Sequence, residues 1–203
     1  MPTFGQLQDR ISLDYLNRTD LLPEVKRAIL NSIRTYEGTR FWFNETQTAL
    51  AASAGQTFVS IPSDFLILDR LEVTQNSSNF KLVETSFDNI KDENIVQTQG
   101  LPVDFSYHGN RFELFPIPDS AYTVTCYYIR TLPVLSADAD TNAWTTEASN
   151  LIAHDAAMDL LANVVQASSD AVQRHAIQRN AAFTELSMRN TTRIIKRLRA
   201  TYF

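Results

Sequence analysis

The side chains that could carry out acid–base or metal chemistry in this chain are few and widely separated. The three histidines are His108, His154 and His175, and none has a second histidine or a cysteine at the short spacing of a metal-binding motif. Asp155 directly follows His154, but consecutive helical residues point about 100° apart, so this pair cannot form a site alone. We interpret all three histidines as ordinary surface or interface residues.

Nucleophile, nucleotide and calcium motifs are also missing from the sequence. It contains no glycine-rich phosphate loop, no Gly-x-Ser-x-Gly turn and no His-Glu-x-x-His pair. The loop around Asp138 and Asp140 superficially resembles a calcium loop, but it lacks the glycine at the sixth position and the distal glutamate, which favours a connecting or capping loop. We therefore expect no enzymatic activity, no cofactor and no metal.

Cys126 is the only cysteine of the chain, which excludes an intrachain disulfide and a zinc site made of several cysteines in one subunit. It lies in a stretch where apolar residues alternate with others, as in a strand. This pattern predicts a small buried side chain, and not a nucleophile.

The end of the chain has a different chemical character from the rest. Five of the 18 lysines and arginines follow Glu185, whereas all 23 acidic residues lie at or before it. The residues to which we assign docking of a partner are Arg193, Ile194, Lys196, Arg197, Leu198, Arg199, Tyr202 and Phe203. Cations interleaved with apolar and aromatic groups favour a helix whose apolar side chains fill a partner's groove. A solvated helix end and binding to a membrane surface are alternative interpretations.

Length and charge set the general class of the protein. The chain has 203 residues, of which 44% are hydrophobic, and this is enough for a substantial core. Its net charge of −5 gives no overall attraction to nucleic acid. The start has no signal-peptide pattern, and no run of eighteen apolar residues occurs, so we expect synthesis and use in the cytoplasm without membrane insertion.

Both ends of the chain have helical periodicity. Thr3 and Gln6 form a capping box for a first helix that extends to about Asn17. A second helix begins near Pro23 and ends before Gly38. After the loop 136–142 two more helices follow, the last of which begins after 168–170.

The middle of the chain alternates with period two and predicts strands. The clearest hairpin pairs 103–107 with 111–115 across the turn His108, Gly109 and Asn110. A second exposed hairpin tip is predicted at Asn76, Ser77, Ser78 and Asn79. The expected fold is α+β, a helical bundle built from the N- and C-terminal helices with an inserted antiparallel β domain. The expected parts are a helical hairpin at 1–42, the β-rich domain at 43–135, and helices at 143–203 with a docking tail at about 190–203.

Four segments, in this order and spacing, resemble the head-to-tail adaptor proteins of tailed bacteriophages, also called connector or tail-tubular-A-like proteins. The first is 4–19, with Asp14-Tyr15-Leu16-Asn17-Arg18, and the second is Ile61-Pro62-Ser63-Asp64-Phe65-Leu66, similar to the LPADFL strand entry of that family. The third is 100–129, which includes Gly109-Asn110-Arg111-Phe112-Glu113-Leu114-Phe115-Pro116 and resembles GNRLRLYPAPD. The fourth is Asn142-Ala143-Trp144-Thr145. The segment beyond Asn190 varies within the family.

The resemblance implies a structural virion protein at the head–tail junction. Such proteins form a ring, usually twelve-fold, that connects the portal to the tail or nozzle protein and continues the DNA channel. By analogy, the C-terminal helix and tail lie in grooves of the portal, and the turns at 76–79 and 108–110 face the tail or a neighbouring subunit. An acidic lumen would let DNA pass without the phosphate contacts that bind it.

Three other functions stay open at this point. The chain could be a neck or tail-completion (stopper) protein at another position in the virion, or an enzyme whose residues form no recognised motif. It could also bind nucleic acid through its basic C-terminus, in which case binding to free DNA would depend steeply on salt.

Overall fold

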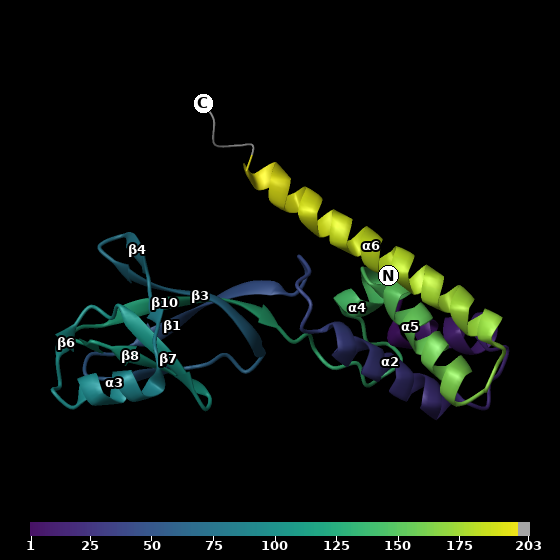
Figure 1. Cartoon of the computed structure of the whole chain (residues 1–203), viewed down its shortest axis with the longest axis horizontal. Coiled ribbons are helices and arrows are strands. Elements are labelled where there is room, and N and C mark those ends of the chain that lie inside the picture. Colours follow the sequence, from purple (N-terminus) through teal and green to yellow (C-terminus); the bar gives the residue numbers. More distant parts are fainter. Residues whose placement is uncertain (199–203) are drawn as a thin grey trace. The chain divides into compact units, whose positions relative to one another are not determined.

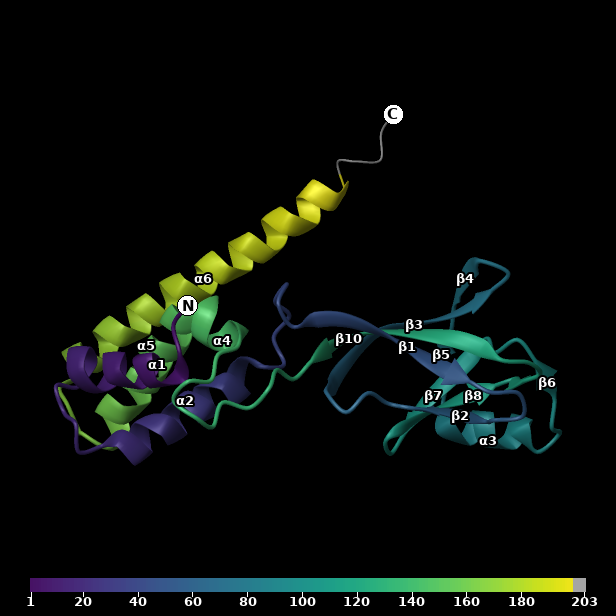
Figure 2. The same cartoon turned by 180° about the vertical axis from the view of Figure 1, so that it is seen from behind.

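The computed structural model describes the backbone of residues 1–198 and the side chains of residues 1–191. Its chain divides into two compact units. Residues 1–44 and the chain from Leu132 onward form the helical unit, and residues 45–131 form the β unit (Figure 1, Figure 2). The α+β class predicted from the sequence is confirmed.

The helical unit begins with the predicted capping box. The amide of Gln6 donates to Thr3 Oγ1 over 3.2 Å, and the amide of Thr3 donates to Gln6 Oε1 over 3.1 Å. The helix that follows has two parts, α1 (Phe4–Asp9) and the wider π-helical turn η1 (Arg10–Tyr15), where the sequence predicted a single regular helix. The second helix, α2 (Leu22–Tyr36), carries the predicted proline in its first turn.

Three further helices complete this unit: α4 (Ala143–Thr146), α5 (Ser149–Asn163) and α6 (Ser169–Leu198). Helix α5 packs against both α2 and α6. It is buried around much of its circumference, and small residues such as Ala153, Ala156 and Ala157 let its neighbours approach closely. The largest buried side chains of the helical core are Phe4, Leu7, Ile11, Ile29, Phe41 and Trp144.

A polar network also joins helices α2, α5 and α6. Tyr36 of α2 donates its hydroxyl hydrogen to Asp155 of α5 over 3.2 Å, and Arg179 of α6 lies 3.5 Å from the same carboxylate. Burial, reinforced by the charge of Asp155, raises the pKa of Tyr36 to about 12. The phenol therefore stays protonated and remains a donor.

Sheet A of the β unit is antiparallel throughout, with strand order β1-β10-β3-β4. Its strands are β1 (Glu45–Ala52), β3 (Phe65–Gln75), β4 (Ser78–Lys81) and β10 (Tyr122–Arg130). The pairing of β3 with β10 shifts register twice, after Tyr127 and after Ile129. Such irregularities re-aim side chains along a strand.

Sheet B has the strand order β2-β8-β7-β5. Its strands are β2 (Phe58–Ser60), β5 (Val83–Glu84), β7 (Asp104–His108) and β8 (Arg111–Phe115). The predicted antiparallel pairing holds for all of sheet A and for β2–β8 and β7–β8 of sheet B. It fails at two short pairs, because β5 pairs with β7 in parallel, as do β6 (Gln99–Gly100) and β9 (Ile117–Pro118). Helix α3 (Phe87–Asn94) lies in the crossover between β5 and β7, and such a connection makes parallel pairing possible.

The β core lies between sheets A and B. Phe105, Phe112 and Leu114 of sheet B pack there with Val124 and Tyr128 of sheet A. Cys126 belongs to the same core and is fully buried, as predicted.

Both predicted hairpin tips are shorter than the sequence suggested. In the β3–β4 turn only Asn76 and Ser77 have positive φ, at 49° and 64°, as in a two-residue turn that suits hairpin twist, and Ser78 and Asn79 already pair with β3. In the β7–β8 turn His108 belongs to strand β7 and pairs with Arg111. Two-residue turns form because their backbone twist matches that of the strands they join.

Candidate docking surfaces

The side chains with catalytic potential are engaged in structural roles. Burial raises the pKa of Cys126 to about 12, which leaves an unreactive thiol. Asp140 Oδ2 accepts hydrogen bonds of 2.7 Å from the amides of Ser136 and Ala137, and these bonds lower its pKa. Asp138 binds Lys26 and Gln8. The loop therefore caps and connects, as we expected from its sequence.

Two histidines that the sequence analysis treated separately are in contact. Nδ1 of His154 in α5 lies 3.1 Å from Nδ1 of His175 in α6, and the ring of Tyr15 stacks on His154 at 5.0 Å. Burial, followed by the neighbouring His175 and Arg10, lowers the pKa of His154 to about 4. Among the described residues, no group of three or more histidine, cysteine, aspartate or glutamate side chains could hold a metal ion. The pair serves to join two helices.

Among the side chains that the structure describes, the last of α6 to contact the rest of its unit are Arg189 and Asn190. Arg189 is 2.8 Å from Glu147 and lies over the ring of Trp42, with its guanidinium carbon 4.6 Å from the ring centroid. Asn190 donates to the carbonyl of Arg40 over 3.3 Å.

The predicted docking residues all follow these two anchors. Arg193, Ile194, Lys196, Arg197 and Leu198 continue the helical backbone, and their side chains lie outside the described residues. Arg199, Tyr202 and Phe203 lie outside the described residues altogether.

The two predicted turn surfaces are exposed but separate. Asn76, Ser77, Ser78 and Asn79 lie on the β3–β4 hairpin, which rises from the body of the β unit (Figure 1). His108, Gly109 and Asn110 lie at another end of the same unit, and the views from front and back agree on this separation (Figure 2). His108 stacks on Phe87 of α3, with ring centroids 3.9 Å apart. The structure therefore brings these two turns into no common site.

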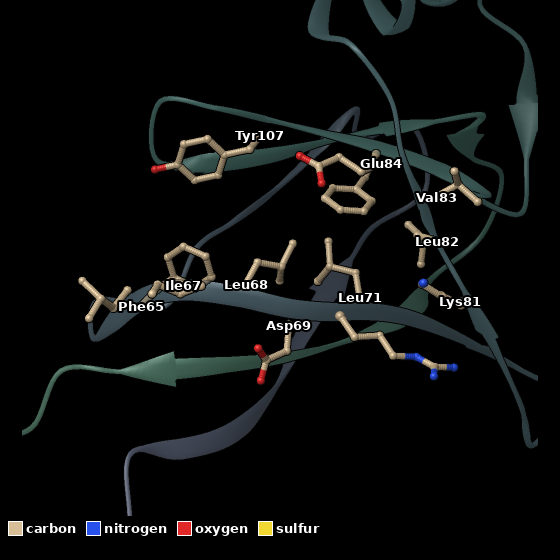
Figure 3. Close-up of a pocket in the computed structure, with 13 residues that line it drawn as sticks. Phe65, Ile67, Leu68, Asp69, Leu71, Lys81, Leu82, Val83, Glu84 and Tyr107 are labelled. Carbon is tan, nitrogen blue, oxygen red and sulfur yellow. The ribbon is translucent and has the colours of Figure 1, made fainter. Parts of the chain in front are cut away.

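A groove that the sequence analysis missed opens between β3 and the edge formed by β4, β5 and β7. It encloses about 650 Å³. Figure 3 shows Leu68, Leu71 and Leu82 around its floor, with Tyr107 at one end and Val83 at the other. The signal for it is the uninterrupted apolar run from Phe65 to Leu68, since in a regular strand alternate residues would face away from the core. We call this feature the β3 groove.

A comparison with known protein families identifies the family of the whole chain. The model of the SU10 adaptor protein family matches residues 2–200 of this chain. The chain belongs to that family.

This membership agrees with the resemblance of the four sequence segments. Proteins of this family are structural components of the phage virion at the head–tail junction, so the chain is assigned that role. The family's partners are portal and tail proteins. A comparison with curated proteins found no match. Within residues 1–198, no helix of the adaptor is both long and apolar enough to cross a bilayer.

Proposed function

We propose that the adaptor assembles as a ring, by family analogy twelve-fold, on the outer face of the portal, links it to the tail or nozzle protein and continues the DNA channel. The observation that carries this proposal is the family match, which spans both units of the chain. Several copies of the chain would form a closed ring, and this ring would stack on the portal and surround the DNA channel.

In this proposal the docking element is the segment 193–203. The anchors at Arg189 and Asn190 hold α6 to its unit up to that point. The segment beyond them is basic, apolar and aromatic in sequence. Its arginines would select the register in a portal groove, and its apolar groups would supply most of the affinity.

The charge of the remaining chain suits a channel lining. All 23 acidic residues lie at or before Glu185, and the whole chain carries a net charge of −5. Carboxylates facing a lumen would repel DNA phosphates and let the genome slide past, whereas lysines and arginines would hold it.

Binding of the purified adaptor to the portal of its virus tests this proposal. Wild-type adaptor should co-sediment with portal rings, and replacing both Tyr202 and Phe203 by alanine should weaken binding by about ten-fold or more. Ile177→Ala is the matched control, because Ile177 is 58% exposed on α6 but lies before the anchors.

Three results would contradict the proposal or its docking element. If the alanine variant binds portal normally, the tail is not the docking element. If the wild-type protein ignores portal and instead binds the assembled tail, a stopper role replaces the adaptor role. Tight binding to free duplex that weakens steeply with salt would favour the nucleic-acid-binding alternative.

A further inference from the structure

The β unit carries an apolar projection as well as the apolar β3 groove. Ile95 and Val96, which follow α3, are 75% and 77% exposed. We call these two residues the α3 tip. Adjacent aliphatic side chains exposed to this extent suggest a contact with another molecule.

The α3 tip is held firmly in place. Lys91 of α3 lies 2.9 Å from the fully buried carboxylate of Glu113, and the side chain of Asn94 donates to the carbonyl of Leu114 over 3.4 Å. Gln97, in a left-handed conformation at φ 55°, donates back to the carbonyl of Asn94 over 3.0 Å. The tip therefore projects from an anchored helix end, so docking it would cost little conformational entropy.

The β3 groove offers a matching apolar surface. Leu71, Leu82 and Phe105 are buried at its floor, whereas Val83 and Tyr107 remain 59% and 51% exposed at its sides. Apolar side chains of another molecule could therefore be buried against Val83 and Tyr107.

Charges on the two features are complementary at one end. Lys81 lies at the Leu82–Val83 end of the groove (Figure 3). Asp92 and Glu93, both exposed, precede the α3 tip by a few residues. A tip seated in the groove with these carboxylates toward Lys81 would pair opposite charges and fix the direction of entry.

Groove and tip lie on opposite faces of sheet B. Glu113 points to the outer face, where it meets Lys91 of α3, whereas its neighbours Phe112 and Leu114 point into the core. Tyr107, which pairs with Phe112, shares that inner side and reaches the groove. A projection on one face and a groove on the other are what a head-to-tail contact between identical subunits requires. Repetition of such a contact gives a ring when the rotation between neighbours closes, and stacking on the portal would impose that rotation.

We infer that the α3 tip of one adaptor copy occupies the β3 groove of the next. This inference rests on the proposed ring and specifies the surface between its subunits. The occupant is a second copy of this chain because its own β unit supplies the projection, the hole and the opposite charges.

Cross-linking between two singly substituted proteins tests this contact. Val83→Cys places a thiol in the groove wall, and Val96→Cys places one on the tip. The two variants are mixed, assembled on portal rings and oxidised. A product of twice the chain mass should appear, and it can form only between copies. The native Cys126 is buried and does not compete.

Matched controls separate this inference from the ring proposal. Ser120→Cys, at an exposed residue of the same unit that does not line the groove, should give no product with Val96→Cys. Portal-bound rings that form without the Val83–Val96 product would overturn the tip-in-groove contact and leave the ring intact. Adaptor that fails to associate with portal at all would instead contradict the proposed function.

Exchanging the charges of Lys81 and Glu93 provides a second, independent test of the contact. Lys81→Glu should weaken ring assembly on portal by about ten-fold, and adding Glu93→Lys should restore it if the two residues face each other. Lys81 lies opposite the buried Glu72 across strands β3 and β4, so thermal melting of both variants accompanies the assembly measurement. The double variant keeps the Lys81→Glu change, so its recovery reports the contact between copies and not the stability of the sheet. Equal assembly of the wild type and Lys81→Glu would contradict the proposed orientation.

Discussion

His154 and His175 meet across the α5–α6 contact with their Nδ1 atoms 3.1 Å apart. A hydrogen bond between two Nδ1 atoms needs one protonated and one unprotonated nitrogen, so it is lost when both rings become imidazolium. Arg10 near His154 and Arg174 near His175 add further positive charge. This contact between α5 and α6, the helix that carries the proposed docking segment, therefore requires that at least one of the two rings is neutral.

Acid should destabilise the helical unit through this pair. Burial lowers the pKa of His154 to about 4 and lowers that of His175, whereas unfolded histidine titrates near 6.5. Between these values the unfolded chain binds more protons, so stability is complete above about pH 6.5 and is lost as the pH falls toward 4. The expected loss is about 1–2 kcal/mol, since the pair is only partly buried.

Urea unfolding followed by tryptophan fluorescence measures this effect, because Trp42 and Trp144 both lie in the helical unit. His175→Gln should flatten the pH profile between pH 4 and 6.5. His108→Gln, which changes an exposed histidine of the β unit, should leave it unchanged. Identical profiles for wild type and His175→Gln would show that the pair does not govern acid sensitivity.

Gly5→Ala should destabilise the helical unit by about 1–3 kcal/mol. A Cβ at this position would lie 2.9 Å from Cβ and 3.1 Å from the carbonyl oxygen of Asp138. The amide of Gly5 also donates to that carbonyl over 2.8 Å, so the two segments cannot separate without losing the bond. Thermal melting checks the expectation, and an unchanged midpoint would mean that the loop yields freely.

Ser77→Gly should stabilise the β unit by about 0.5–1 kcal/mol, because Ser77 adopts φ 64° and glycine reaches this region without a steric cost. Ser77→Val should have the opposite effect. Calorimetry of the full chain compares the three proteins. A Ser77→Gly protein less stable than wild type would show that the serine side chain contributes more than its backbone strain removes.

Glu113→Gln should destabilise the β unit by about 2–3 kcal/mol. The carboxylate of Glu113 is fully buried, and its oxygens lie 2.9 Å from Lys91 and 2.7 Å from Arg111. Adding Lys91→Met to this variant should recover part of the loss, because one unmatched cation is then removed. Hydrogen exchange should report the change first in α3, and uniform loosening of the whole β unit would contradict its assignment as an anchor.

Local patterns predicted much of this fold. The capping box at Thr3, the proline at the start of α2 and the alternating strands 104–108 and 111–115 each depend on neighbours in sequence. The parallel pairing of β5 with β7 was not predicted, because two-residue strands carry no periodicity and their partners are set by the path through α3.

The docking surfaces were predicted only in part. The basic apolar segment after Asn190 is visible as composition, whereas the β3 groove arises from register shifts in β3 and from strands brought together by the fold. Predicting the contact of His154 with His175 would have required knowing that α5 and α6 pack against each other as a helical hairpin on either side of the connection 164–168. Long-range contacts of this kind leave no local signal.

Electron imaging of the adaptor mixed with the portal of its virus tests the central claim most directly. The account predicts a ring of adaptor copies stacked on the outer face of the portal, coaxial with its channel, with the end of α6 from each copy against portal. Portal rings with no added density, alongside adaptor bound to tails or remaining free, would contradict it.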